Sequence, residues 1–172
     1  MSDPAAPAEP EAVPVAPMHG LRGSLLLAAV IVAADQATKH WAVNRLSGDR
    51  TIDIVWTLRM NLTFNSGMAF SSGTGLGPFI GLVAIVVVVV VVAGVRKNPS
   101  KVVAVAAGLV VGGALGNVAD RLFRGDGWLH GSVVDFIDFQ WFPIFNVADM
   151  AVNIGAVLFV LWSLFSKQEA RS

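Results

Sequence analysis

The sequence contains no cysteine, and only three histidines occur among its 172 residues. The absence of cysteine excludes disulfides, thiolate metal sites and a cysteine nucleophile. His19, His40 and His130 are widely spaced, so we expect no histidine metal centre. We also expect no cofactor. Charged residues are also scarce, at 14% of the chain, whereas soluble domains contain roughly 25%.

Hydrophobic residues are abundant instead. They make up 55% of the chain, and the mean hydropathy is +0.67. The length allows one domain. This composition predicts an integral membrane protein in contact with membrane lipids. The formal net charge of +0 gives no indication of a nucleic-acid partner.

Four long apolar segments predict a mainly α fold, a bundle of four transmembrane helices. A helix needs about 20 apolar residues to cross the hydrocarbon core of a bilayer. The predicted spans are residues 24–43, 76–95, 102–122 and 147–165. We expect them to form a single membrane domain from about residue 21 to residue 167. The Pro- and Ala-rich residues 1–20 lack an apolar pattern and are predicted to be disordered.

The basic residues indicate an orientation. With four spans, both termini lie on one side of the membrane. The short turn from Arg96 to Lys101 is the densest basic cluster between the spans, and such loops remain in the cytoplasm. We therefore expect the tail of residues 1–20 and the tail of residues 168–172 to be cytoplasmic.

In residues 51–64, between the first two spans, every even position is apolar, and the odd positions are polar except for Val55. This period predicts a strand with one buried face. The other face is too polar for the membrane, so we expect a small extracytoplasmic β-sheet built from about residues 48–72 and 126–138. Asn65 and Gly67 follow the alternating segment and predict a tight turn.

The third predicted span has a distinctive face. Gly108, Gly112 and Gly116 recur every four residues, which favours close approach of a neighbouring helix. In the first span, Asp35 and Lys39 lie four residues apart and share a helix face. Two interpretations of that pair stay open: an ion pair that merely ends the helix at the interface, or one that braces an active site.

Polar residues gather at the outer end of the predicted bundle. Groups of this kind are costly in a membrane and commonly mark a function. They are Asp35, Lys39, Asn117, Asp120, Arg121, Asp135, Asn146 and Asp149. Their common position predicts one shared polar pocket.

Asp135 and Asp149 are each embedded in an apolar stretch on either side of a short aromatic linker. Two nearby carboxyls cannot both ionise easily and hold one proton between them, as in an aspartic protease. Water would then be the nucleophile, with one acid as base and the other as acid. The simpler alternative is that Asp149 only caps the following helix and Asp135 only ends a strand.

Five motifs occur in order along the chain: Asp35–Lys39, Asn65–Phe70, Gly112–Arg121, Val133–Phe136 and Phe145–Asp149. Together they resemble the bacterial lipoprotein signal peptidases, also called signal peptidase II. The resemblance implies an aspartic endopeptidase of the inner membrane, with its active site at the extracytoplasmic face. Such enzymes hydrolyse the signal peptide of diacylglyceryl-modified prolipoproteins just before the lipidated cysteine.

By this resemblance, Asp135 and Asp149 are the catalytic pair. Site-supporting or substrate-binding roles fall to Asp35, Lys39, Asn65, Gly67, Asn117, Asp120, Arg121, Asn146 and Ala148. The alternating segment corresponds to the family's small sheet, which cradles the substrate. We expect prolipoproteins as partners, no metal, and a monomer.

Two other functions fit the same residues. A small proton-coupled transporter or channel would also use acids within the membrane, and flux that depends on Asp149 would indicate it. A non-catalytic assembly factor would use the acids only to hold its helices together. In that case replacing Asp135 with asparagine would destabilise the fold.

Overall fold

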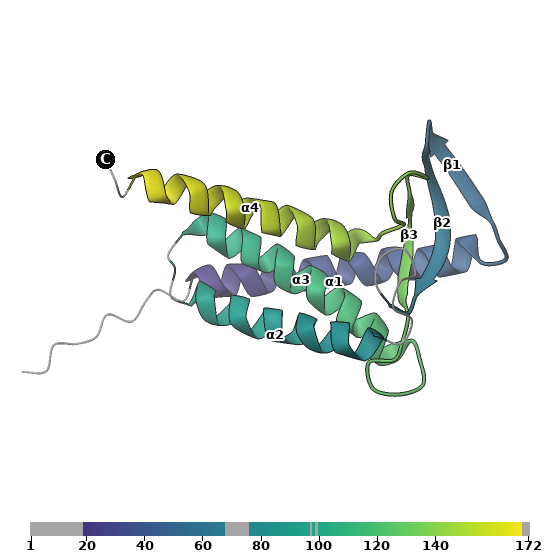
Figure 1. Ribbon diagram of the computed structural model, residues 1–172, viewed down its shortest axis with the longest axis horizontal. Helices are drawn as coiled ribbons and strands as arrows, with labels where there is room; N and C mark the ends of the chain where they lie inside the picture. Colours follow the sequence, from purple (N-terminus) through teal and green to yellow (C-terminus); the bar gives the residue numbers. More distant parts are fainter. Residues whose placement is uncertain (1–18, 68–75, 97, 99, 170–172) are drawn as a thin grey trace, which may run out of the picture.

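The computed structural model describes residues 19–67, 76–96, 98 and 100–169. Its elements are helices α1 (His19–Leu46), α2 (Gly77–Val95), α3 (Lys101–Phe123) and α4 (Val147–Glu169), and strands β1 (Thr51–Val55), β2 (Leu58–Asn65) and β3 (Val133–Asp138). The helices form a bundle, and the sheet lies across one end of it (Figure 1). The predictions for residues 1–18, 68–75 and 170–172 fall outside the described residues.

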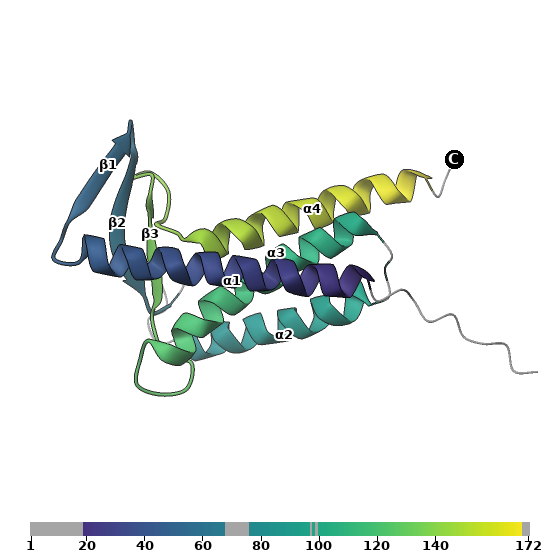
Figure 2. The same ribbon diagram turned by 180° about the vertical axis from the view of Figure 1, so that it is seen from behind.

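The four helices are each long and apolar enough to cross a membrane, which confirms the predicted membrane fold. At 1.5 Å per residue, the 19 residues of α2 reach about 29 Å, close to the thickness of the hydrocarbon core. Large apolar side chains such as Phe79 and Phe165 are exposed on the outside of the bundle, where lipid would cover them. The start of α1 and the end of α4 lie at the end opposite the sheet (Figures 1 and 2).

Helix α3 is the centre of the bundle, and its glycines explain how closely it is packed. A Cβ atom at Gly108 would lie 2.9 Å from the Ser24 carbonyl oxygen of α1, and one at Gly112 would lie 2.9 Å from that of Ala28. Gly113 faces α4 in the same way, against the carbonyl of Ala148. The predicted small-residue face is therefore confirmed, and a second face packs equally closely against α4.

The three strands form an antiparallel sheet in the order β1-β2-β3. The prediction of one continuous strand over residues 51–64 is wrong, because the chain turns at Trp56 and Thr57. Trp56 has a positive φ of 51° in this turn. A two-residue turn preserves the alternation: Ile52 faces Met60 across the hairpin, and both have even numbers. The period of the sequence therefore could not reveal the reversal.

Only part of the hairpin has the expected buried face. Every residue of β1 is exposed. In β2, the apolar residues Met60 and Leu62 pack against Ala42 and Leu46 of α1 together with Phe136. The opposite face of β2 is polar and is turned toward the candidate site, which lies where the sheet meets the bundle.

Candidate active site

A buried ion network joins α1 to α3 at the sheet end of the bundle. Lys39 Nζ lies 2.8 Å from Asp35 Oδ2 and 2.7 Å from Asp120 Oδ2, and all three side chains have 0% exposure. Arg124 Nε contacts the other oxygen of Asp120 at 2.7 Å. Two acids thus face two bases, so the buried charges compensate one another.

The same network fixes the two segments that carry the candidate catalytic acids. Asp35 Oδ1 accepts a hydrogen bond of 2.9 Å from the backbone N–H of Ala148, at the start of α4. Asp120 Oδ2 accepts one of 3.1 Å from the N–H of Val134 in β3. Lys39 and its partners therefore lie deep in the protein and connect the two segments that carry the candidate acids. The pair does not end α1, because the helix continues to Leu46.

Asp149 is held at the first turn of α4. Its backbone N–H donates to Asn146 Oδ1 at 2.9 Å, and its Oδ2 accepts from the N–H of Asn146 at 3.2 Å. This reciprocal pair is a capping box, with Asn146 as the N-cap residue. The other oxygen, Oδ1, accepts a bond of 2.8 Å from Asn117 Nδ2. Asp149 therefore caps the helix, as the simpler interpretation proposed, and also presents an oxygen to the site.

Asp135 lies in the middle of β3, so it does not end a strand. Asn146 Nδ2 donates to its Oδ1 at 2.6 Å, and Asn65 Nδ2 donates to its Oδ2 at 3.2 Å. Burial raises the pKa of Asp135 to about 7, and the nearby carboxyl of Asp149 adds to the increase. Asn146 thus bonds to both acids, through its side chain to one and its backbone to the other.

The side chain of Asn117 is oriented by the ion network. Its Oδ1 accepts hydrogen bonds from Lys39 Nζ at 2.9 Å and from Asn146 Nδ2 at 3.2 Å. With its oxygen engaged by two donors, the amide must turn its Nδ2 toward Asp149. A charge buried between α1 and α3 thereby determines which group of Asn117 faces the candidate acid.

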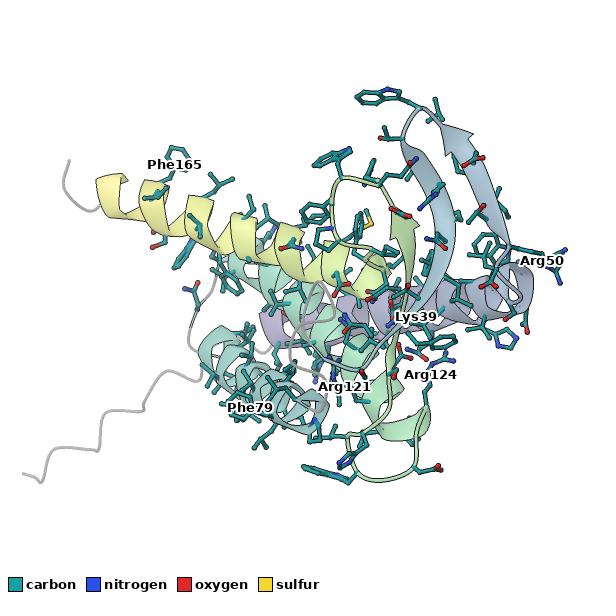
Figure 3. The ribbon with its side chains drawn as sticks, turned by 45° about the vertical axis from the view of Figure 1, so that its right-hand side comes forward. Lys39, Arg50, Phe79, Arg121, Arg124 and Phe165 are labelled. Atoms are coloured by element: carbon teal, nitrogen blue, oxygen red, sulfur yellow. The ribbon has the colours of Figure 1, made fainter. Side chains whose placement is uncertain are left out.

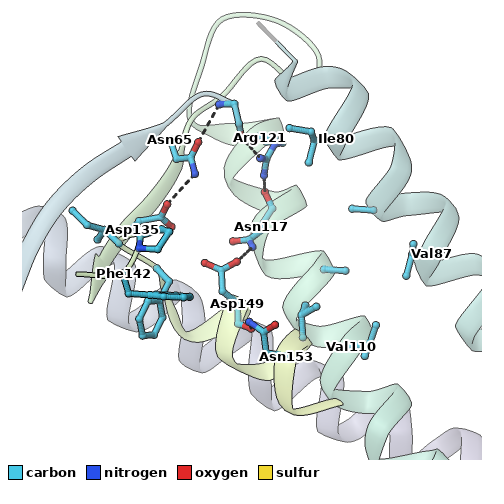
Figure 4. Close-up of a pocket in the computed structure, with 17 residues that line it drawn as sticks. Asn65, Ile80, Val87, Val110, Asn117, Arg121, Asp135, Phe142, Asp149 and Asn153 are labelled. Atoms are coloured by element: carbon cyan, nitrogen blue, oxygen red, sulfur yellow. Dashed lines mark hydrogen bonds between the residues drawn. The ribbon is translucent and has the colours of Figure 1, made fainter. Parts of the chain in front are cut away.

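Both acids border one cavity of about 530 Å³ between α2, α3, α4 and the aromatic linker (Figure 4). The end next to the sheet is polar, lined by Asn65, Asn117 and Arg121 beside the two carboxyls. Apart from Asn153, the rest is apolar and runs down the bundle along residues of the helices: Ile80, Ala84, Val87, Val110, Ala114 and Val152. The arrangement can hold a polar, reacting group at the acids and an apolar chain beneath it.

Arg121 approaches the acids from α3. Its terminal nitrogens donate long hydrogen bonds of 3.4 Å to the carbonyls of Asn117 and Gly67. Gly67 belongs to the predicted tight turn, which is confirmed by a bond of 3.1 Å from its N–H to Asn65 Oδ1. Figures 3 and 4 show Arg121 directed toward the cavity between α2 and α3.

The structure brings every predicted site residue to this one region, including Ala148 through its backbone. Sequence reasoning missed other members of the site. Gln36 Nε2 bonds to both Asp35 Oδ2 and Asp120 Oδ1 at 3.2 Å, and Arg124 completes the ion network. Arg59 pairs with Asp138 at 2.7 Å across the sheet. The polar residues at alternate positions of β2 were the sequence signal that could have identified Arg59. Among residues 19–67, 76–96, 98 and 100–169, no group of three potential metal ligands converges.

The family model and the relatives found by sequence agree on one family. The family model described as signal peptidase (SPase) II matches residues 27–165. A lipoprotein signal peptidase of Mycobacterium leprae is 40% identical over 160 residues, covering 92% of this chain and 80% of the relative. One from Mycolicibacterium smegmatis is 43% identical over 161 residues, covering 93% and 68%. A solved bacterial membrane enzyme superposes with a TM-score of 0.74 at 29% identity, covering 87% of this chain and 91% of the other.

Proposed function

This chain belongs to the signal peptidase II family of membrane peptidases, and we propose that it is an aspartic endopeptidase acting on diacylglyceryl prolipoproteins. Asp135 and Asp149 are its catalytic acids. The observation that carries this proposal is their shared environment. They border one cavity, are both bonded to Asn146, and include one carboxyl whose pKa is raised to about 7.

The proposed reaction uses water between the two carboxyls. Asp149 takes a proton from the water molecule, whose oxygen attacks the carbonyl carbon of the residue before the cysteine. Asp135 donates its proton to the carbonyl oxygen, which gives a tetrahedral diol. Asp149 then passes its proton to the amide nitrogen as the C–N bond breaks, and Asp135 recovers a proton from the diol. The products are a free carboxyl on the signal peptide and a free amine on the lipidated cysteine.

The other site residues support this chemistry. Asn146 and Asn117 hold the acids through the hydrogen bonds described above. Asp35, Lys39 and Asp120 hold those amides and the backbone of Ala148 in place. Arg121, Asn65 and Gly67 line the cavity, where they position the substrate. A fixed array of this kind stabilises developing charge without reorganising during the reaction.

The apolar part of the cavity suits a lipid-bearing substrate. Its apolar lining comes from Ile80, Ala84 and Val87 of α2, Val110 and Ala114 of α3, and Val152 of α4. Each buried methylene of a bound chain contributes about 0.8 kcal/mol. Binding of the diacylglyceryl group would therefore fix the depth of the cysteine and bring the preceding bond to the acids.

We infer the orientation from the basic residues of the turn between α2 and α3, and the position of the helix ends supports it. With that turn in the cytoplasm of the inner membrane, both termini are cytoplasmic, and the sheet and acids lie at the extracytoplasmic face. A secreted precursor reaches the acids from that face. We assign residues 21–167 to a single peptidase domain that works as a monomer.

The test is incubation of the purified protein in detergent with a synthetic diacylglyceryl prolipoprotein peptide, followed by mass measurement. We expect one cut, directly before the modified cysteine. The matched control is the same peptide with an unmodified cysteine, which should remain intact. Equal cleavage of both peptides would contradict the proposed role of the lipid, and cleavage of neither would contradict the proposed substrate class.

A further inference from the structure

A second cavity, of about 450 Å³, lies beside the first, on the sheet side of Asp135. It is lined by the polar face of β2 (Arg59, Asn61, Thr63 and Asn65), by Asp135 and Asp138 of β3, and by residues of the linker that follows β3. Asn65, Asp135 and Phe142 border both cavities. The two cavities therefore meet at Asp135, one apolar and directed into the bundle, the other polar and directed along the sheet.

The charges in this polar cavity are unequally accessible. Arg59 Nε contacts Asp138 Oδ2 at 2.7 Å, but the arginine side chain is 34% exposed and the aspartate only 4%. Asn61 Nδ2 and the N–H of Gln140 also donate to Asp138, at 3.1 and 2.6 Å. Burial opposes ionisation of Asp138, yet these hydrogen bonds hold its pKa below the ordinary value. Asp138 also borders the cavity, but it is less exposed than Arg59, so a molecule in the cavity meets mainly the guanidinium.

We propose that this polar cavity binds the residues that follow the scissile bond, and that Arg59 selects among them by charge. The inference rests on the proposed function. The apolar part of a precursor would bind in the first cavity and its scissile bond would lie at the acids. The residues after that bond would then extend along the sheet. An acidic side chain just after the cysteine would meet the accessible guanidinium, and a basic one would be repelled by it.

The size of the effect follows from the exposure of Arg59. An ion pair with a partly exposed arginine contributes modestly, which corresponds to a preference of about two- to fivefold. Because the Arg59 guanidinium is partly exposed to solvent, the preference should decrease as salt is added. Asp138 limits the preference, since its negative charge lies beside the guanidinium.

The experiment uses diacylglyceryl precursor peptides that are identical up to the cysteine and carry Glu, Gln or Lys at the two following positions. The quantity measured is the ratio of kcat/KM values within one enzyme preparation, which does not depend on the folded fraction. For the wild-type protein, we expect the acidic peptide to exceed the basic one about two- to fivefold. Arg59→Gln should bring the ratio close to one, and Arg59→Lys should preserve it.

Two further variants separate charge selection from a structural role. Asp138→Asn leaves Arg59 without its neutralising partner, so the acidic-to-basic ratio should increase above the wild-type value. Arg50→Gln removes an exposed arginine outside both cavities and should leave the ratio unchanged (Figure 3). Equal losses for all peptides in Arg59→Gln, or a wild-type ratio of one, would overturn the inference. Failure of the wild-type protein to cut any peptide would instead overturn the proposed function.

Discussion

The stability of Asp135→Asn relative to wild type should depend on pH. It should be higher at neutral pH than at acidic pH. Asp135 is only 2% exposed, and burial together with Asp149 raises its pKa from 3.8 to about 7. A tenfold change in proton affinity corresponds to about 1.36 kcal/mol. The interval between 3.8 and about 7 therefore corresponds to about 4 kcal/mol of unfolding free energy.

The sign follows from where the proton is held. Between about pH 4 and pH 7, the folded state keeps a proton on Asp135 that the unfolded state releases. The contribution of this proton to stability is complete below about pH 4 and is lost as the pH rises through about 7. The asparagine variant lacks this titration. The side-chain NH2 group of the new asparagine also faces the NH2 group of Asn65 or Asn146. Two donors then meet without an acceptor, which costs about 1–3 kcal/mol at every pH.

The assay is chemical unfolding in detergent between pH 4.5 and pH 8, for wild type and Asp135→Asn. As the pH rises across this window, the unfolding free energy of the variant minus that of wild type should increase by up to about 4 kcal/mol. Asp53→Asn, at an exposed carboxyl on β1, is the matched control. A difference that is constant over the window, or that moves toward wild type, would refute the reasoning. It would also remove the electrostatic argument for a shared proton.

Two further predictions concern packing around the site. Lys39→Met should cost about 3–5 kcal/mol in unfolding free energy, because it leaves Asp35 and Asp120 buried without their common partner. Adding Asp35→Asn and Asp120→Asn should restore much of that loss, and a fully stable single variant would contradict the network. Gly113→Ala should destabilise the protein by about 1–3 kcal/mol, since the new methyl meets the Ala148 carbonyl. Gly94→Ala, which has no neighbour within 4 Å, should be neutral or slightly stabilising; equal effects at both positions would contradict close packing.

The helices could be predicted from the sequence because each depends on a local property. Hydropathy and length alone locate a membrane span, and the predicted span of 76–95 differs from α2 by one residue. The pairing of Asp35 with Lys39 was also local, since a four-residue offset fixes their common face. Their direct contact with Asp120 depends on how α3 packs against α1; the sequence predicted a shared polar pocket but not this contact.

The parts of the site that could not be predicted depend on register and on hydrogen-bond direction. The turn at Trp56 left the alternation intact, so the strand order was hidden. Arg59 meets Asp138 only because β2 and β3 pair in the observed register. Asn146 was expected near the acids, but its double role, as N-cap and as a bridge to Asp135, requires the start of α4 to lie beside β3.

The two interpretations of Asp149 in the sequence are not mutually exclusive. The capping box uses its backbone N–H and Oδ2, whereas Oδ1 is held by Asn117 at the border of the cavity. A residue that caps a helix has a fixed position, and a catalytic group benefits from the same restraint. For any variant of Asp149, folding should therefore be measured as well as activity.

The most direct test of the account is the mass of the products formed from a diacylglyceryl prolipoprotein by wild type, Asp135→Asn and Asp149→Asn. Each variant is first shown to unfold cooperatively. The account predicts complete conversion by wild type to two fragments separated before the modified cysteine, and intact precursor with either variant. Cleavage by either folded variant at a rate near that of wild type would contradict a mechanism that needs both carboxyls.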